Sequence, residues 1–169
     1  MSDADARQDL LDALAEAIGE LGLALATLGE AYELLDENSQ DRLEEQLFGP
    51  VQKGYGRAQR TYAAFAERKR LPNRTFTEPS AGLHSRDPRV YHDRAIEAII
   101  EGEERLIELQ DSMMPVTYGD PELRAGLAEV REFVAAARER SHDFMRTLGR
   151  GPPRGCGRAP TSAGRWPAS

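Results

Sequence analysis

Residues 11–35 read LDALAEAIGELGLALATLGEAYELL, and bulky apolar side chains recur along this stretch at alternating spacings of three and four residues. They are Leu11, Leu14, Ile18, Leu21, Leu25, Leu28, Tyr32 and Leu35. This heptad spacing aligns the side chains along one narrow face of an α-helix. The stretch therefore predicts a long helix that buries this face, which we call the seam, against other helices.

Small residues flank the seam on both sides at heptad positions e and g. They are Ala15, Gly22, Gly29, Ala17, Ala24 and Ala31. A glycine inside a helix costs roughly 1 kcal/mol relative to alanine, so we interpret Gly22 and Gly29 as the points where a neighbouring helix comes closest. A leucine at either position is then expected to destabilise the fold by overpacking.

Three further stretches carry the same kind of apolar stripe. With a first helix at about 4–36, they predict helices at about 40–69, 88–114 and 121–148. The residues expected to be buried in them are Leu43, Leu47, Val51, Tyr55, Ala58, Tyr62 and Phe65, then Tyr91, Ala95, Ile99, Gly102, Leu106, Leu109 and Met113, then Leu123, Leu127, Val130, Val134, Ala137, Ser141, Phe144 and Leu148.

Capping and breaking residues support these helix limits. Asn38 or Ser39 is a suitable N-cap for the second helix. Asp87 and Asp120 are each followed by proline, the pattern expected where the third and fourth helices begin. Pro50 lies inside the second stripe, and because proline lacks an N–H and clashes with the preceding turn, it predicts a kink or a restart there.

A long linker joins the two predicted helical hairpins. Residues 71–88 are rich in proline and have no helical period. Extended, they reach roughly 55 Å, which exceeds the length of about 42 Å expected for a helix of 28 residues. We therefore predict an all-α, antiparallel four-helix bundle at 1–149. A linker that crosses the bundle lengthwise gives a ferritin-like topology, which we favour, and one that doubles back gives up-down-up-down.

Charge is distributed along the chain in blocks of alternating sign. Two blocks are acidic: residues 1–48 carry 13 acids and 2 bases, and residues 90–122 carry 9 acids and 2 bases. The other two are basic: residues 49–89 carry 3 acids and 9 bases, and residues 123–169 carry 4 acids and 9 bases. Such alternation is expected where consecutive segments pack side by side and complement one another. It also argues against a nucleic-acid-binding domain, because no large uniform basic face results.

A ferritin-like layout raises the question of a dimetal site, which takes two Glu-x-x-His pairs and two further glutamates facing inward. The chain has one such pair, Glu139 and His142, and the stripe of the fourth helix turns both away from the core. The second helix, 40–69, has no histidine. We therefore expect no metal ligands, no cofactor and no catalytic residues.

The densest polar and aromatic group follows Pro50. Tyr55, Arg57, Gln59, Arg60 and Tyr62 fall within two helical turns. Together they are candidates to line a pocket for a small anion or another ligand. The alternative is that the rings pack in the core while the charged ends reach solvent.

The function predicted from these features is non-enzymatic. We expect a helical-bundle protein that acts through protein–protein contacts, with another protein or a second copy of itself as partner. The alternative is a small-ligand- or metal-binding bundle. No apolar run approaches the ~20 residues needed to span a bilayer, and the acidic start lacks a signal-peptide pattern, so we expect a cytoplasmic protein.

Two features at the end of the chain fit this view. Cys156 is the single cysteine, so no internal disulfide is possible, as is usual in a reducing compartment. Residues 150–169 are rich in glycine, proline and arginine and lack acids, and we expect this tail to be disordered.

Overall fold

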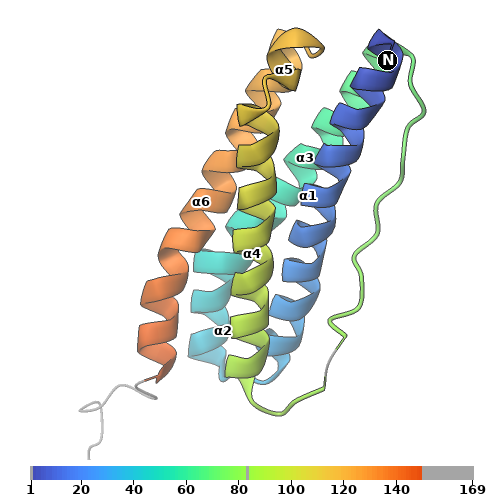
Figure 1. Cartoon of the computed structure of the whole chain (residues 1–169). Coiled ribbons are helices and arrows are strands. Elements are labelled where there is room, and N and C mark those ends of the chain that lie inside the picture. The colour runs from blue at the N-terminus through green and yellow to red at the C-terminus, as the bar shows by residue number, and fades with distance from the viewer. Residues whose placement is uncertain (1, 83, 150–169) are drawn as a thin grey trace, which may run out of the picture.

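The computed structural model describes residues 2–82 and 84–149, and all regular structure in these ranges is helical. The elements are α1 (Asp3–Glu33), α2 (Glu37–Leu43), the π-helical turn η1 (Glu44–Phe48), α3 (Gly49–Lys69), α4 (Pro88–Asp111), α5 (Met114–Thr117) and α6 (Pro121–Gly149). Figure 1 shows the four long helices, α1, α3, α4 and α6, side by side in one bundle. The predicted tail, residues 150–169, lies outside the described residues.

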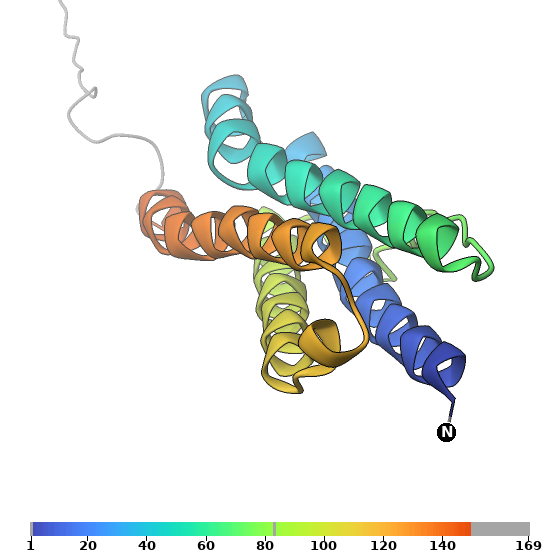
Figure 2. The same cartoon turned by 90° about the horizontal axis from the view of Figure 1, so that it is seen from above.

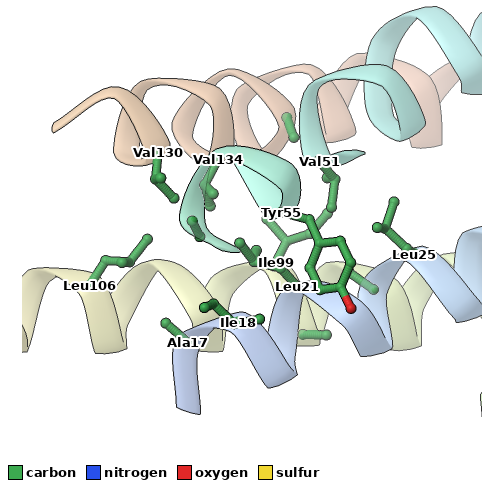
Figure 3. Packing of buried hydrophobic residues seen from close by; sticks show 14 of the residues in the cluster. Ala17, Ile18, Leu21, Leu25, Val51, Tyr55, Ile99, Leu106, Val130 and Val134 are labelled. Atoms are coloured by element: carbon green, nitrogen blue, oxygen red, sulfur yellow. The ribbon is translucent and has the colours of Figure 1, made fainter. Parts of the chain in front are cut away.

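The apolar stripes read from the sequence meet at the centre of the bundle. The seam residues from Leu11 to Leu28 are buried, and so are the small residues Ala17, Ala24 and Ala31 beside them. Figure 3 shows two layers, with α3 and α6 on one side and α1 and α4 on the other, and apolar side chains filling the space between them. The predicted four-helix bundle is therefore confirmed.

Contacts at the two ends of the bundle establish the direction of each helix. At one end Arg7 of α1 donates from Nε to the carbonyl oxygen of Tyr118 at 3.1 Å, and Arg68 of α3 forms a bidentate pair with Asp120 at 2.7 and 2.8 Å. At the other end the rings of His92 and Phe144 stack with centroids 5.4 Å apart. Hence α3 and α4 run parallel.

The linker crosses the length of the bundle, as the ferritin-like prediction requires, and Figure 1 shows it along the side of α1. Two of its residues hold it there. The ring of Phe76 meets Tyr62 edge-on, with centroids 5.2 Å apart. Pro79 lies over Gly22, where an added Cβ would be 3.2 Å from the proline Cδ. The absence of a side chain at Gly22 thus makes room for both the linker and Tyr55 of α3.

Several predicted boundaries are corrected by local hydrogen bonds. The first helix ends at Glu33, and the N-cap of α2 is Asp36, whose carboxylate accepts the Ser39 N–H at 2.8 Å. Neither Asn38 nor Ser39 is the cap, because both lie inside the first turn of α2. The caps predicted at Asp87 and Asp120 are present.

The end of the third predicted helix also differs. α4 stops at Asp111, and Met113 adopts a left-handed conformation with φ 67° before the single turn of α5. Met113 was expected in the core but is 56% exposed, because this backbone reversal turns it out of the apolar stripe. Figure 2, which views the bundle from the end where the chain begins, shows α5 between α4 and α6.

Pro50 is accommodated by a π-helical turn instead of a sharp break. Proline cannot donate to the carbonyl of residue 46, and its ring would collide with that carbonyl in a regular α-helix. The chain inserts η1 just before it, in which the Gly49 N–H bonds back to the Glu44 carbonyl, five residues earlier. The helix then continues as α3, so the predicted restart takes the form of a bulge.

The two glycines that were interpreted as close contacts behave differently. A Cβ at Gly22 would lie 3.2 Å from Tyr55 Cε1 and from Pro79 Cδ. A Cβ at Gly29 would meet nothing within 4 Å in the described part of the chain. The prediction for Gly29 was therefore wrong, because no other described element comes close to α1 at that position.

These contacts predict opposite effects of the same substitution at the two glycines. Gly22→Leu should destabilise the protein by about 1–3 kcal/mol, because the new side chain must displace Tyr55 and Pro79. Gly29→Leu should leave stability unchanged or raise it, since leucine has the better helix propensity. Urea denaturation of both variants measures the difference, and equal losses in both would contradict this account.

Candidate functional site

The five residues predicted to line a ligand pocket fall on different faces of α3. Tyr55 and Tyr62 lie on the face toward α1 and the linker, and both are buried. Figure 3 shows the ring of Tyr55 between α3 and α1. Burial raises the pKa of both phenols, so both stay protonated at neutral pH. Both rings are thus part of the core, Tyr55 beside Gly22 and Tyr62 against Phe76.

The other three residues do not join the tyrosines. Arg57 points toward α6, where it pairs with Glu129. It also donates to Oγ1 of Thr61, one turn further along α3, at 3.2 Å. Arg60 is exposed, with its guanidinium beside Gly56, and Gln59 is half-buried. A convergent anion pocket needs donors aimed at one point, and these side chains diverge around the helix.

The Glu139 and His142 pair is exposed on α6, as the stripe predicted. Across residues 2–82 and 84–149, no three His, Cys, Asp or Glu side chains are placed to share a metal ion.

The charged residues divide the bundle into two unequal layers. The most extensive helix contact joins α1 to α4, and the next joins α3 to α6. α1 carries eight acids and one arginine, and α4 carries seven acids and three arginines. α3 carries five bases and one acid, and α6 carries five of each. α1 contacts α3 and α4 contacts α6, as the alternation predicts, but α3 and α4 make no extensive contact in the described residues, and the largest contact is between two acidic helices.

A surface groove follows the contact between the acidic helices. It has a volume of about 440 Å³. Its lining residues are Glu20, Leu23, Arg94, Glu97, Ile100, Glu101 and Glu104. Arg94 pairs with Glu97 at 3.4 Å, and nearby Arg105 pairs with Glu16 and Glu101. Glu20 and Glu104 have no ion pair among the described residues, which leaves the groove acidic with apolar side chains along it.

A second groove, of about 450 Å³, lies between the start of α4 and the end of α6, at the end of the bundle opposite Arg7. Its unusual member is His92, which is 2% exposed and has no hydrogen-bond partner for either ring nitrogen in the described residues. Burial lowers the pKa of His92, and Asp93, with Oδ1 3.7 Å from Nδ1, opposes this effect. The stacking on Phe144 accounts for the position of the neutral ring.

A smaller and more apolar pocket lies between the end of α1 and η1. Its volume is about 190 Å³, and Gly29, Tyr32, Glu33, Glu44 and Phe48 line it. Gly29 contributes no side chain to the pocket, and Glu44 and Phe48 of the π-turn line its other side. Heptad periodicity cannot reveal such a pocket; the signals that were available are the proline inside a helical stripe and a glycine with no packing role.

Comparisons with known proteins add no assignment: no family model matches the chain, and no curated protein or solved structure is significantly similar to it. None of the helices described here has both the length and the apolar character needed to cross a membrane.

The buried His92 predicts a loss of stability on mild acidification. The unfolded histidine titrates near pH 6.5, and the folded one has a lower pKa, so the unfolded state binds more protons between the two values. The contribution of neutral His92 is complete above about pH 6.5 and falls as the pH drops toward the folded pKa. Urea denaturation at about pH 7.5 and about pH 5.5 should show this loss.

Two variants separate His92 from other titrating groups. His92→Phe keeps an aromatic ring against Phe144 and should reduce the loss between the two pH values. His142→Gln, which removes an exposed histidine from the same groove, should leave the loss intact. An unchanged pH dependence in His92→Phe would contradict the assignment.

Proposed function

We propose that the protein is a non-enzymatic bundle that acts through protein–protein contacts, and that a second copy of the chain is its partner. The observation that carries the proposal is the unequal charge of the two layers, with acidic α1 and α4 on one side and basic α3 on the other. One chain thus offers two complementary surfaces. The cytoplasmic location expected from the sequence belongs to this proposal.

The acidic surface has the features of a docking groove. Leu23 and Ile100 lie along its floor and are half-buried, and the unpaired carboxylates of Glu20 and Glu104 lie beside them. Apolar side chains framed by like charges suit a partner whose surface has an apolar strip framed by the opposite charge.

The basic counterpart lies on the outer face of α3. Lys53 and Arg60 are two helical turns apart, both are exposed, and neither has an ion pair among the described residues. A contact between the α3 face of one copy and the acidic groove of another is heterologous. Each exposed ion pair contributes at most ~1 kcal/mol, so the association is expected to be weak and sensitive to salt.

The seam of α1 does not take part in this contact. The residues from Leu11 to Leu28 are buried within the bundle, and Leu10, which lies off the seam, is buried as well. An intermolecular coiled coil through α1 would require the bundle to open. Self-association therefore depends on the outer surface of the helices, where charge is concentrated.

Sedimentation at two salt concentrations tests the proposal. At about 20 mM salt, where screening extends over roughly 20 Å, the average mass should rise with concentration above the monomer mass of 18.7 kDa. At about 500 mM salt, where screening acts within roughly 4 Å, the monomer should predominate. A strictly monomeric protein at low salt and high concentration would overturn the proposal.

Matched charge variants locate the surface. Glu20→Gln with Glu104→Gln removes two carboxylates from the acidic groove and should weaken association at least severalfold. Glu132→Gln with Glu139→Gln makes the same change in net charge on exposed positions of α6 and should have little effect. Equal effects of the two pairs would mean that net charge alone, and not the groove, governs association.

A further inference from the structure

The pocket between the end of α1 and η1 is a space that a larger side chain on α1 could fill without disturbing the core. Its floor is Gly29, which has open space where a side chain would stand. Its opposite wall contains Glu44 and Phe48, the first and last residues of the π-turn. The side chain of Gln40 donates to the Tyr32 carbonyl at 2.8 Å and ties α2 to α1 beside it. The walls of the pocket are therefore held in place by the helices.

The size of the pocket limits what it accepts. About 190 Å³ is the share of roughly six water molecules in the liquid. Pockets for drug-sized ligands are about 300–1,000 Å³. A compact ligand of a few heavy atoms therefore fits within the pocket, whereas a nucleotide or an extended cofactor would extend beyond it.

The lining residues select positive charge. Tyr32 and Phe48 are half-buried aromatic side chains, and the faces of aromatic rings attract cations. Glu33 and Glu44 are carboxylates without an ion pair among the described residues. No lysine or arginine lines the pocket. The set combines aromatic surface with two negative charges, the chemistry that recognises alkylammonium groups.

The position of Glu33 gives independent support. It lies in the last turn of α1, which contains no basic residue. The end of a helix carries a partial negative charge that disfavours a carboxylate and favours a cation. The carboxylate is thus unfavourable for the isolated helix, and a bound cation would offset both negative charges at once.

From these observations we propose that the pocket binds a small organic cation of the alkylammonium class. The methyl or methylene groups of the cation contact Tyr32 and Phe48, and its charge lies between Glu33 and Glu44. This site is separate from the acidic groove of α1 and α4, and binding there does not require self-association.

Choline and its neutral carbon analogue 3,3-dimethylbutan-1-ol test the charge selection directly. The two have the same shape and differ in a single charged atom. Titration of the full chain, followed by NMR, should shift the signals of Gly29, Tyr32 and Phe48 with choline. The neutral analogue should bind at least about tenfold more weakly. Equal affinity for both, or no shift with choline at millimolar concentration, would overturn the proposal.

Two glycines on α1 provide a matched pair of variants. Gly19 and Gly29 both have open space where a Cβ would stand, but only Gly29 lines the pocket. Gly29→Leu should fill the pocket and abolish choline binding, whereas Gly19→Leu should retain it. Because both changes improve helix propensity, the melting temperature should not fall in either. Choline binding that survives Gly29→Leu in a folded protein would overturn the proposal.

A third variant addresses the carboxylates. Glu44→Gln removes one negative charge from an exposed position and keeps the shape of the side chain. It should weaken choline binding at least severalfold and leave the weak binding of the neutral analogue unchanged. Loss of affinity for both probes equally would assign the effect to shape, and the proposed recognition of charge would be wrong.

Discussion

The bundle depends on burial of the α1 seam. Its large side chains from Leu11 to Leu28 are buried, and each contributes roughly 1.5–3 kcal/mol relative to an exposed position. The alanines beside the seam are buried too, so α4 packs against a wide stripe of α1 and not a narrow one. This helix contacts both α3 and α4, and its contact with α4 is the largest of those that join the two hairpins. The linker is positioned by the same helix, through the space left at Gly22.

Pro50 is the main local departure from this regular packing, and its consequences extend beyond the helix that contains it. Removing one backbone donor forces the π-turn η1. Leu47 within the turn and Val51 just after it both remain in the core. Phe48, the last residue of the turn, is half-buried and lines a pocket together with residues at the end of α1. A constraint on one amide thus contributes to a pocket on the surface of the bundle.

The periodicity of the sequence was sufficient to predict the long helices and their buried faces, because these depend on spacing. The length of the linker favoured the crossover but left the doubled-back alternative open. Periodicity was insufficient where backbone conformation departs from a regular helix, as at Met113, or where the packing of a third element decides the outcome, as at Gly29. For the candidate sites, the aromatic character of Tyr55 and Tyr62 was recognised, but the sequence could not show that both rings would be buried. The buried His92 and the π-turn pocket arise from contacts between segments far apart in the chain, which no local pattern records.

The pairing of the two acidic helices shows which force decides the arrangement. Sign alternation along the chain favours contacts between opposite charges, yet α1 makes its largest contact with α4. Exposed like charges cost tenths of a kcal/mol per pair and are screened by salt. Burying Leu21, Ile99 and Leu106 in the shared core gains several kcal/mol. Apolar burial therefore determines the neighbours, and the acidic side chains remain on the outer surface, where Arg105 neutralises only part of them. The acidic side chains that Arg105 does not pair with keep their negative charge on the surface. The fold tolerates this charge because apolar burial, and not ion pairing, supplies its stability.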